Sequence, residues 1–156
     1  MTDVRIAGDG DLLAMLRVLA QGGDDREPPD APTERETAAW ARMMATPDLR
    51  VYVGEVDGEI VGTATSLRLP HVTHDCAPTV FIEAVVVATA HRRRGVASAV
   101  ISRLMADARD DGCDKVQLLS HKRHATDGAH ALYTSLGFEA MAEGFRHYFL
   151  TGPRGG

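Results

Sequence analysis

The stretch that decides the fold is Val85-Val86-Val87-Ala88-Thr89-Ala90-His91-Arg92-Arg93-Arg94-Gly95-Val96-Ala97. Its β-branched start predicts a strand, and a basic turn with one glycine then leads into a helical pattern. The first turn of a helix has backbone N–H groups without intrahelical partners, and the helix dipole adds partial positive charge there. Gly95 allows a ligand to approach the backbone, and the three arginines add charge. The stretch therefore predicts a phosphate-binding turn.

Other interpretations of the same segment are weaker or remain open. A dinucleotide fingerprint requires Gly-x-Gly-x-x-Gly, and a Walker loop requires Gly-Lys-Ser/Thr after four spaced residues. Neither motif occurs in this segment. From these residues alone, a solvated basic turn between a strand and a surface helix stays the alternative.

Length and composition limit the kinds of protein to which this chain can belong. The chain has 156 residues, of which 44% are hydrophobic, so we expect one globular domain over residues 1–156. It lacks the run of about 18 apolar residues that a membrane span needs, and its polar N-terminus does not resemble a signal peptide. We therefore expect a cytoplasmic protein without a membrane partner.

Charge and cysteine content exclude further classes. A net charge of −5 argues against a nucleic-acid partner and makes the arginine triplet a local feature. The two cysteines, Cys76 and Cys113, have no metal or redox spacing, which disfavours a disulfide framework. Clustered potential ligands occur at His71, His74 and Cys76, but their spacing fits no zinc motif, and we expect no metal site.

The hydrophobic pattern alternates between strand and helix periods along the chain. It predicts strands over residues 4–6, 50–56, 59–69, 79–87, 115–120, 138–142 and 145–150. It predicts helices over residues 9–22, 34–44, 96–110 and 126–136. Asp57-Gly58 is a type I′ hairpin signal, and Thr33 with Glu36 is a capping box. The order β-α-α-β-β-β-α-β-α-β-β predicts an α/β fold with a mixed sheet and helices on its faces.

Two motifs resemble one known family. Arg-x-x-Gly-x-Ala at residues 92–97 is similar to the cofactor loop of GCN5-related N-acetyltransferases, the GNAT family. Residues 129–138, Ala-His-Ala-Leu-Tyr-Thr-Ser-Leu-Gly-Phe, resemble the family's second block. The order of elements matches from about residue 3 to residue 150. One position departs: Thr126 stands where many members have an asparagine that helps to hold the cofactor.

The resemblance implies a site for acetyl-CoA as co-substrate, without a metal. In the family pattern two strands separate near a bulge, so the backbone of Val85 and Val87 would pair with the pantetheine arm. The pyrophosphate would lie on the N–H groups of residues 94–98, aided by arginine side chains. The predicted cofactor-binding residues are Val85, Val86, Val87, Arg92, Arg93, Arg94, Gly95, Val96, Ala97 and Ser98.

Acetyl transfer to an amine requires two proton movements. An alkyl ammonium is only about one part in a thousand neutral at pH 7, so a base must accept its proton. Glu83 is the candidate, because strand alternation would place it on one face with Phe81, Val85 and Val87. A carboxylate paired with an arginine is the structural alternative, and His121 is an alternative base.

The leaving thiolate needs a proton, and Tyr133 stands at the family's tyrosine position, where the resemblance implies a general acid. A tyrosine that only packs in the core is its structural alternative. The developing oxyanion would meet the backbone N–H of Val86 or Val87.

Together these features predict an acetyl-CoA-dependent N-acetyltransferase. We expect the acceptor to be a primary amine on a small molecule, in a pocket shaped by the loops over residues 24–32 and 70–78. The alternatives are acetylation of a protein N-terminus or lysine, and a catalytically silent acyl-CoA-binding module. The resemblance also allows a homodimer.

Overall fold

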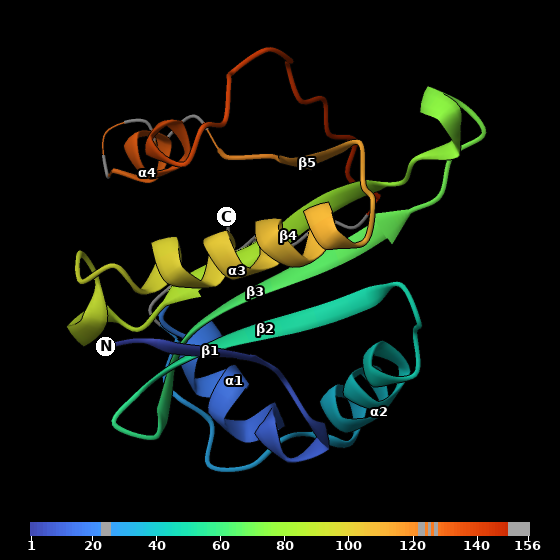
Figure 1. The fold of residues 1–156 in the computed structure, drawn as a ribbon. Helices are drawn as coiled ribbons and strands as arrows, with labels where there is room; N and C mark the ends of the chain where they lie inside the picture. Colours follow the sequence, from blue (N-terminus) through green and yellow to red (C-terminus); the bar gives the residue numbers. More distant parts are fainter. Residues whose placement is uncertain (23–25, 122–123, 125, 127, 150–156) are drawn as a thin grey trace. The chain divides into compact units, whose positions relative to one another are not determined.

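The computed structural model describes residues 1–22, 26–121, 124, 126 and 128–149. The chain divides into two compact units, Met1–Leu118 and Leu119–Gly156. The first unit holds one sheet whose strands are β1 (Asp3–Ile6), β2 (Leu49–Val56), β3 (Glu59–Leu69), β4 (Thr79–Val87) and β5 (Lys115–Leu118). They lie side by side in chain order (Figure 1). Strands β1 to β4 pair antiparallel and β5 joins β4 in parallel, which confirms the predicted mixed sheet.

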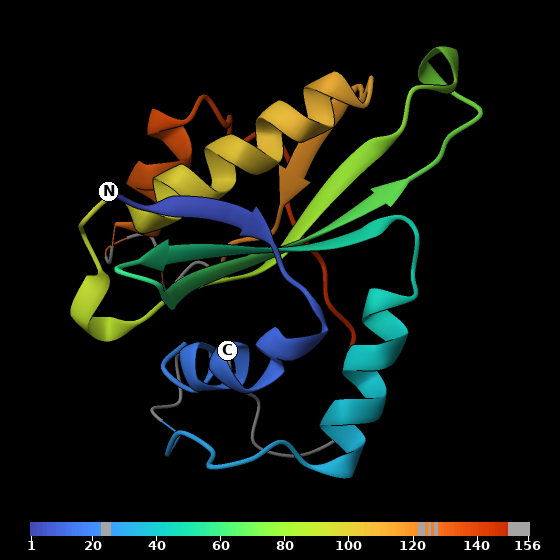
Figure 2. The same cartoon turned by 60° about the horizontal axis from the view of Figure 1, so that its bottom comes forward.

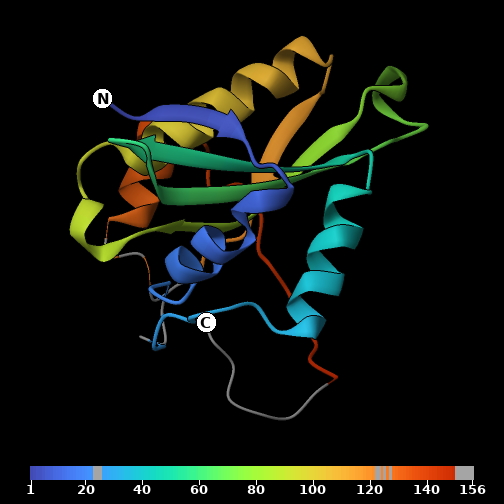
Figure 3. The same ribbon diagram turned by 90° about the horizontal axis from the view of Figure 1, so that it is seen from below.

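Helices cover both faces of this sheet. On one face lie the short 3-10 helix η1 (Asp9–Asp11), α1 (Leu12–Leu19) and α2 (Glu34–Met44), and on the other lies α3 (Val96–Asp110) (Figures 2 and 3). Met15 and Trp40 pack with Val51 and Val53 of β2 in a core under α1 and α2. The described helices all lack the length or the apolarity that a bilayer crossing requires.

The local signals in the sequence produce the predicted turn and cap. Asp57 has φ 52° and Gly58 has φ 82°, the two positive values that a type I′ hairpin needs between β2 and β3. At the start of α2 the Glu36 N–H donates to Thr33 Oγ1 at 3.2 Å, and the Thr33 N–H donates to Glu36 Oε2 at 2.8 Å. Both predictions are confirmed.

Two glycines allow α3 to pack closely against the sheet. Gly54 and Gly62 are partners in the β2–β3 register. A Cβ on Gly62 would lie 2.5 Å from Val96 Cγ1, and one on Gly54 would lie 2.9 Å from Val100 Cγ2. The first turns of α3 therefore rest on backbone, which fixes the position of the helix N-terminus relative to β3.

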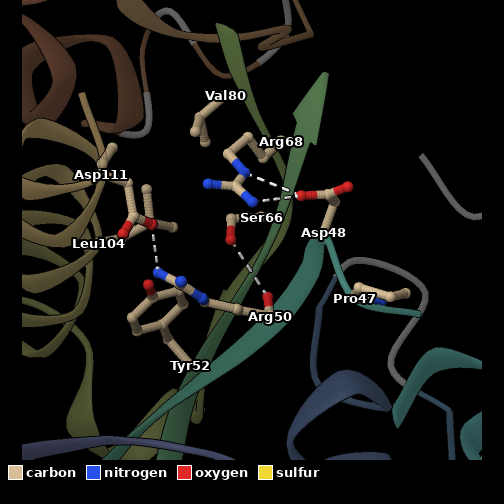
Figure 4. Close-up of a pocket in the computed structure, with 10 residues that line it drawn as sticks. Pro47, Asp48, Arg50, Tyr52, Ser66, Arg68, Val80, Leu104 and Asp111 are labelled. Atoms are coloured by element: carbon tan, nitrogen blue, oxygen red, sulfur yellow. Dashed lines mark hydrogen bonds and ion pairs between the residues drawn. The ribbon is translucent and has the colours of Figure 1, made fainter. Parts of the chain in front are cut away.

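Polar contacts hold the other end of α3 to the same face of the sheet (Figure 4). Arg50 pairs with Asp111 at 2.7 Å, and the Tyr52 hydroxyl donates to Asp107 at 2.9 Å. Burial raises the pKa of Tyr52. The hollow between these side chains has a volume of about 20 Å³, roughly the space of one water. This network is structural and too tight for a substrate.

In the first unit, several helices and strands begin or end at other residues than predicted. The predicted helix over residues 9–22 begins as the 3-10 turn η1 and ends as α1 at Leu19, and β5 stops at Leu118, two residues early. Strand β4 and helix α3 have the predicted bounds. The differences arise at element ends, where capping and tertiary pairing decide the last residues.

The second unit contains α4 (Ala129–Ser135), which begins later than predicted. Gly128 has φ 95°, a left-handed conformation that cannot belong to the helix, so α4 starts after it. The Tyr133 and Phe138 rings meet edge to face at 5.9 Å. The predicted closing strands are absent from residues 138–149, and Leu150 lies outside the described residues. Their alternating pattern is present, but a strand also needs a partner for its backbone hydrogen bonds, and these residues form no ladder.

Candidate active site

A β-bulge interrupts β4 at its centre. Opposite it, the register moves from Thr65 paired with Glu83 to Thr63 paired with Val86, so three steps on β4 face two steps on β3. Ala84 has φ 52°, a left-handed conformation that is uncommon for alanine. Bulges of this kind bend a strand and change the direction of its side chains.

The bulge corrects the predicted faces of β4. Thr63 and Thr65 are two residues apart and share a face, so their partners Val86 and Glu83 share that face as well. Val87 pairs with Gly62 and lies on the opposite face. The prediction that Glu83 shares a face with Val87 is therefore wrong, because simple alternation does not survive the extra residue.

Beyond the bulge, β4 has an unpaired side that we call the open edge, residues 83–87. Strand β5 pairs with β4 only from Thr79 to Ile82, and no other strand of Met1–Leu118 continues the ladder on that side. The Ala88 N–H donates to Val61 on β3. Because successive backbone groups of a regular strand point to alternate edges, the N–H group of Val87 points to the open edge. Val87, rather than Val86, thus has the N–H that a ligand there would meet.

A tight turn connects the open edge to α3. The chain passes from β4 through the 3-10 helix η3 (Thr89–His91), and Arg93 (φ 63°) and Gly95 (φ 82°) are both left-handed. Gly95 is the N-cap of α3, and a Cβ added to it would have no heavy atom within 4 Å. The space beside Gly95 is therefore open, and the first N–H groups of α3 have no partner within the helix. These features fit the predicted phosphate-binding turn.

Arg92 differs from its two neighbours. Its Nε donates to the Val87 carbonyl at 3.2 Å and its Nη2 donates to the Gln21 carbonyl, just after α1. Gln21 Oε1 in turn accepts the Thr89 N–H at 2.8 Å. Arg92 thus joins the end of α1 to the end of β4. Arg93 and Arg94 are exposed and form no ion pair within the described residues, so their charge is available to a ligand.

The candidate catalytic residues lie in different units. Glu83 is exposed on β4, and the described residues give its carboxylate no hydrogen bond or ion pair; the alternative of an arginine partner stays a prediction. Tyr133 is half-buried on α4, in the second unit, and His121 is exposed in that unit as well.

The histidine-rich segment between β3 and β4 does not assemble a metal site. His71 Nε2 lies 3.0 Å from Thr79 Oγ1, and His74 meets the His71 ring edge to face. Across the described ranges, no three potential ligands come together. Cys113 is half-buried, and burial raises the pKa of its thiol.

A cavity next to the bulge was not predicted from the sequence. This α1/α2 cavity has a volume of about 190 Å³ and is lined by Leu12, Met15, Leu16, Leu19, Glu36, Ala39, Trp40, Met43, Thr65 and Ala84. The helical spacing of the leucines indicated only a packed core. Periodicity shows which side chains face inward, but it does not show that the space between them stays unfilled.

Acetyl-CoA fits the residues of this site. Its pantetheine arm carries amides, and the open edge offers unpaired backbone groups beside the bulge. Its pyrophosphate suits the turn at Gly95. This glycine directly precedes α3, and no heavy atom lies within 4 Å of the position that a Cβ would take there.

The comparisons with known proteins agree with this geometry. The model of the Acetyltransferase (GNAT) family matches residues 14–138. The chain belongs to the GNAT family. It is 31% identical over 145 residues to glucosamine 6-phosphate N-acetyltransferase of Trypanosoma brucei brucei, covering 90% of this chain and 94% of the relative.

Solved structures show the same fold. A putative acetyltransferase from Agrobacterium tumefaciens str. C58 superposes with a TM-score of 0.85 at 34% identity, covering 94% of this chain and 99% of that one. AAC(6')-Iy, in complex with the bisubstrate analogue CoA-S-monomethyl-acetylneamine, superposes with a TM-score of 0.76 at 20% identity, covering 97% and 99%. The GNAT family uses acetyl-CoA as co-substrate, and this chain is an acetyl-CoA-dependent acetyltransferase.

Proposed function

We propose that this GNAT protein transfers the acetyl group of acetyl-CoA directly to a primary amine on a small molecule. The observation that carries the proposal is the bulge at Ala84, which has the open edge of β4 on one side and the α1/α2 cavity beside it. One strand segment therefore borders a place for the donor and a place for the acceptor.

On the donor side, the backbone of Val85 and Val87 pairs with the pantetheine amides. The N–H groups at the start of α3 receive the pyrophosphate, and Arg93 and Arg94 add charge. Arg92 acts as a positioning residue, because its guanidinium already bonds to Val87 and Gln21. The Val87 N–H meets the carbonyl oxygen of the acetyl group as negative charge develops on it.

On the acceptor side, Glu83 accepts a proton from the substrate ammonium, through a water molecule. The amine nitrogen then forms a bond to the acetyl carbon, and the bond between that carbon and sulfur breaks. Tyr133 gives its proton to the departing sulfur, an assignment that rests on its motif, and the second proton of the attacking nitrogen passes through water to restore the tyrosine. His121 is the second candidate for the base, because imidazole is a common general base in enzymes.

A small acceptor is favoured over a protein. The α1/α2 cavity lies between two helices and the sheet, and its volume of about 190 Å³ suits a compact ligand better than a polypeptide segment. The named activity of the trypanosomal relative is also acetylation of a small amine. The cytoplasmic location and the homodimer stay predictions.

The donor site is tested by Gly95→Glu with Gly112→Glu as its matched control. The two glycines lie at opposite ends of α3, both have positive φ, 82° and 74°, and neither has a heavy atom near its missing Cβ. We expect Gly95→Glu to raise the Kd for acetyl-CoA at least tenfold, about 1.4 kcal/mol, because it sets a carboxylate against the pyrophosphate. Calorimetric titration measures both, and an equal Kd for the two variants would refute the placement.

The catalytic roles are tested by pH–rate profiles of Glu83→Gln and Tyr133→Phe, with Tyr148→Phe as the control. Loss of a general acid or base typically costs about 10²–10⁴ in rate. We expect Glu83→Gln to remove the acidic limb of kcat/KM and Tyr133→Phe to lower kcat without changing the Kd for acetyl-CoA. A wild-type kcat in Tyr133→Phe would exclude the acid role, and an unchanged acidic limb in Glu83→Gln would shift the base to His121.

A further inference from the structure

The α1/α2 cavity has mostly apolar walls. Its walls are formed by aliphatic and sulfur-containing side chains of α1 and α2 and by the Trp40 ring. The indole N–H of Trp40 is already bonded to the Asp9 carbonyl at 3.2 Å, so the ring offers the cavity only its apolar surface. Such walls stabilise a hydrocarbon group and provide few hydrogen bonds for hydroxyl groups.

The cavity also borders the place where acetyl transfer occurs. Ala84, the bulged residue, and Thr65 on β3 both line it. Thr65 is the cross-strand partner of Glu83, so the Glu83 carboxylate lies on the same face of the sheet as the cavity. A ligand whose apolar part fills the cavity therefore has its free end near Glu83 and the open edge.

A second carboxylate lies in the cavity wall. Glu36 Oε2 accepts two hydrogen bonds from Thr33, both at 2.8 Å, whereas Oε1 has no partner within the described residues. The Thr33 backbone and hydroxyl hydrogen bonds lower the pKa of Glu36, so this carboxylate is charged at neutral pH. None of the ten side chains that line the cavity is basic. The charge at the cavity thus favours a cation and disfavours a phosphate.

Building on the proposed function, we propose that the acceptor is a primary monoamine with an apolar alkyl or aryl body. The body fills the α1/α2 cavity, and the ammonium group lies between Glu36 and Glu83, the latter taking its proton. The volume of about 190 Å³ suits one aromatic ring, because a cavity of about 150 Å³ accommodates benzene.

This acceptor differs from the one named for the trypanosomal relative. Glucosamine 6-phosphate carries several hydroxyl groups and a phosphate of about two negative charges. In the α1/α2 cavity its hydroxyls would lack partners and its phosphate would meet Glu36. The relative's substrate therefore does not transfer to this chain.

A substrate panel tests the proposal. Thiol release from acetyl-CoA is measured with 2-phenylethylamine, ethanolamine and glucosamine 6-phosphate, and acetyl-CoA binding is checked by calorimetry. We expect kcat/KM for 2-phenylethylamine to exceed that of the two polar amines at least tenfold. A preference for a polar amine would overturn the apolar acceptor and leave the proposed function standing. Bound acetyl-CoA with no amine turned over would overturn the proposed function itself.

Two pairs of variants locate the acceptor. Ala39→Leu adds volume to the cavity and should raise KM for 2-phenylethylamine about tenfold, whereas Ala38→Leu, exposed on the same helix, should not. Glu36→Gln keeps the capping box but removes the charge, and should raise the same KM several-fold. Its control, Glu34→Gln, lies in the same first turn outside the cavity. The KM for acetyl-CoA should stay constant in all four, and equal effects within either pair would overturn the placement.

Discussion

The two faces of the sheet are packed in different ways. On the α3 face, Gly54 and Gly62 let the helix rest on backbone, and the remaining hollow measures about 20 Å³. On the face of α1 and α2, the cavity measures about 190 Å³. The difference separates two roles. The tightly packed face fixes the N-terminus of α3, where we propose that the pyrophosphate of acetyl-CoA binds, and the loosely packed face leaves room for the proposed acceptor.

The largest expected contrast comes from removing a leucine on each face. Leu104 on α3 is 1% exposed, so Leu104→Ala should lower the free energy of unfolding by about 2–5 kcal/mol. Leu16 on α1 already borders the cavity and has fewer contacts to lose. Leu16→Ala should cost less than about 2 kcal/mol. Urea denaturation of both variants measures the difference, and equal losses would mean that the two faces are packed alike.

The close approach of α3 is broken by adding one methyl group to β3. Gly62→Ala places a Cβ 2.5 Å from Val96 Cγ1 and should destabilise the protein by about 1–3 kcal/mol. Gly10→Ala is the control, because no heavy atom lies within 4 Å of its Cβ. The double variant Gly62→Ala/Val96→Ala should recover part of the loss in thermal unfolding. If it does not, the cost arises elsewhere than at this contact.

The smallest expected effect concerns the ion pair between Arg5 and Asp11, just before α1, the helix that forms one wall of the α1/α2 cavity. The Asp11 carboxylate accepts from Arg5 at 2.6 Å and from the Gly8 N–H at 2.7 Å, and chiefly the Arg5 hydrogen bond lowers its pKa. A lowered pKa in the folded state stabilises the protein above the unfolded value, about 3.9, and this contribution is lost as the pH falls through the folded value.

Asp11→Asn should therefore lower stability at pH 7 by less than about 1 kcal/mol, because Arg5 is partly exposed. The difference in stability between Asp11→Asn and the wild type should disappear below about pH 4. Thermal unfolding from pH 7 down to about pH 2 measures this difference in stability, with Asp3→Asn on β1 as the control. A gap that persists at pH 2 would show that the ion pair is not its source.

Much of the first unit follows from local sequence. Gly95 marks the start of α3, Asp57-Gly58 makes the hairpin, and Thr33 caps α2, because each of these features depends on a few neighbouring residues. The pairing of residues 138–149 depends on distant partners, and there the alternation alone predicted strands that the described residues do not form.

The site was predictable to a similar extent. The turn at Arg92–Gly95 and the strand before it were identified from their residues, whereas the position of the bulge was not, because Ala84 carries no signal for a left-handed conformation. That one residue moved Val86 to the face of Glu83 and Val87 to the opposite face. The cavity was missed because its lining has the pattern of an ordinary core, and the role of Arg92 depends on Gln21, 71 positions away.

The contact between Arg92 and Gln21 has a consequence for the order of events in the enzyme. It connects the end of α1, a wall of the cavity, with the turn in front of α3, so we expect a ligand that moves one of them to move the other as well. Energetic coupling between two binding sites is reciprocal. By whatever factor a bound amine changes the affinity for acetyl-CoA, acetyl-CoA changes the affinity for the amine by the same factor, and we expect Arg92 and Gln21 to link the two sites.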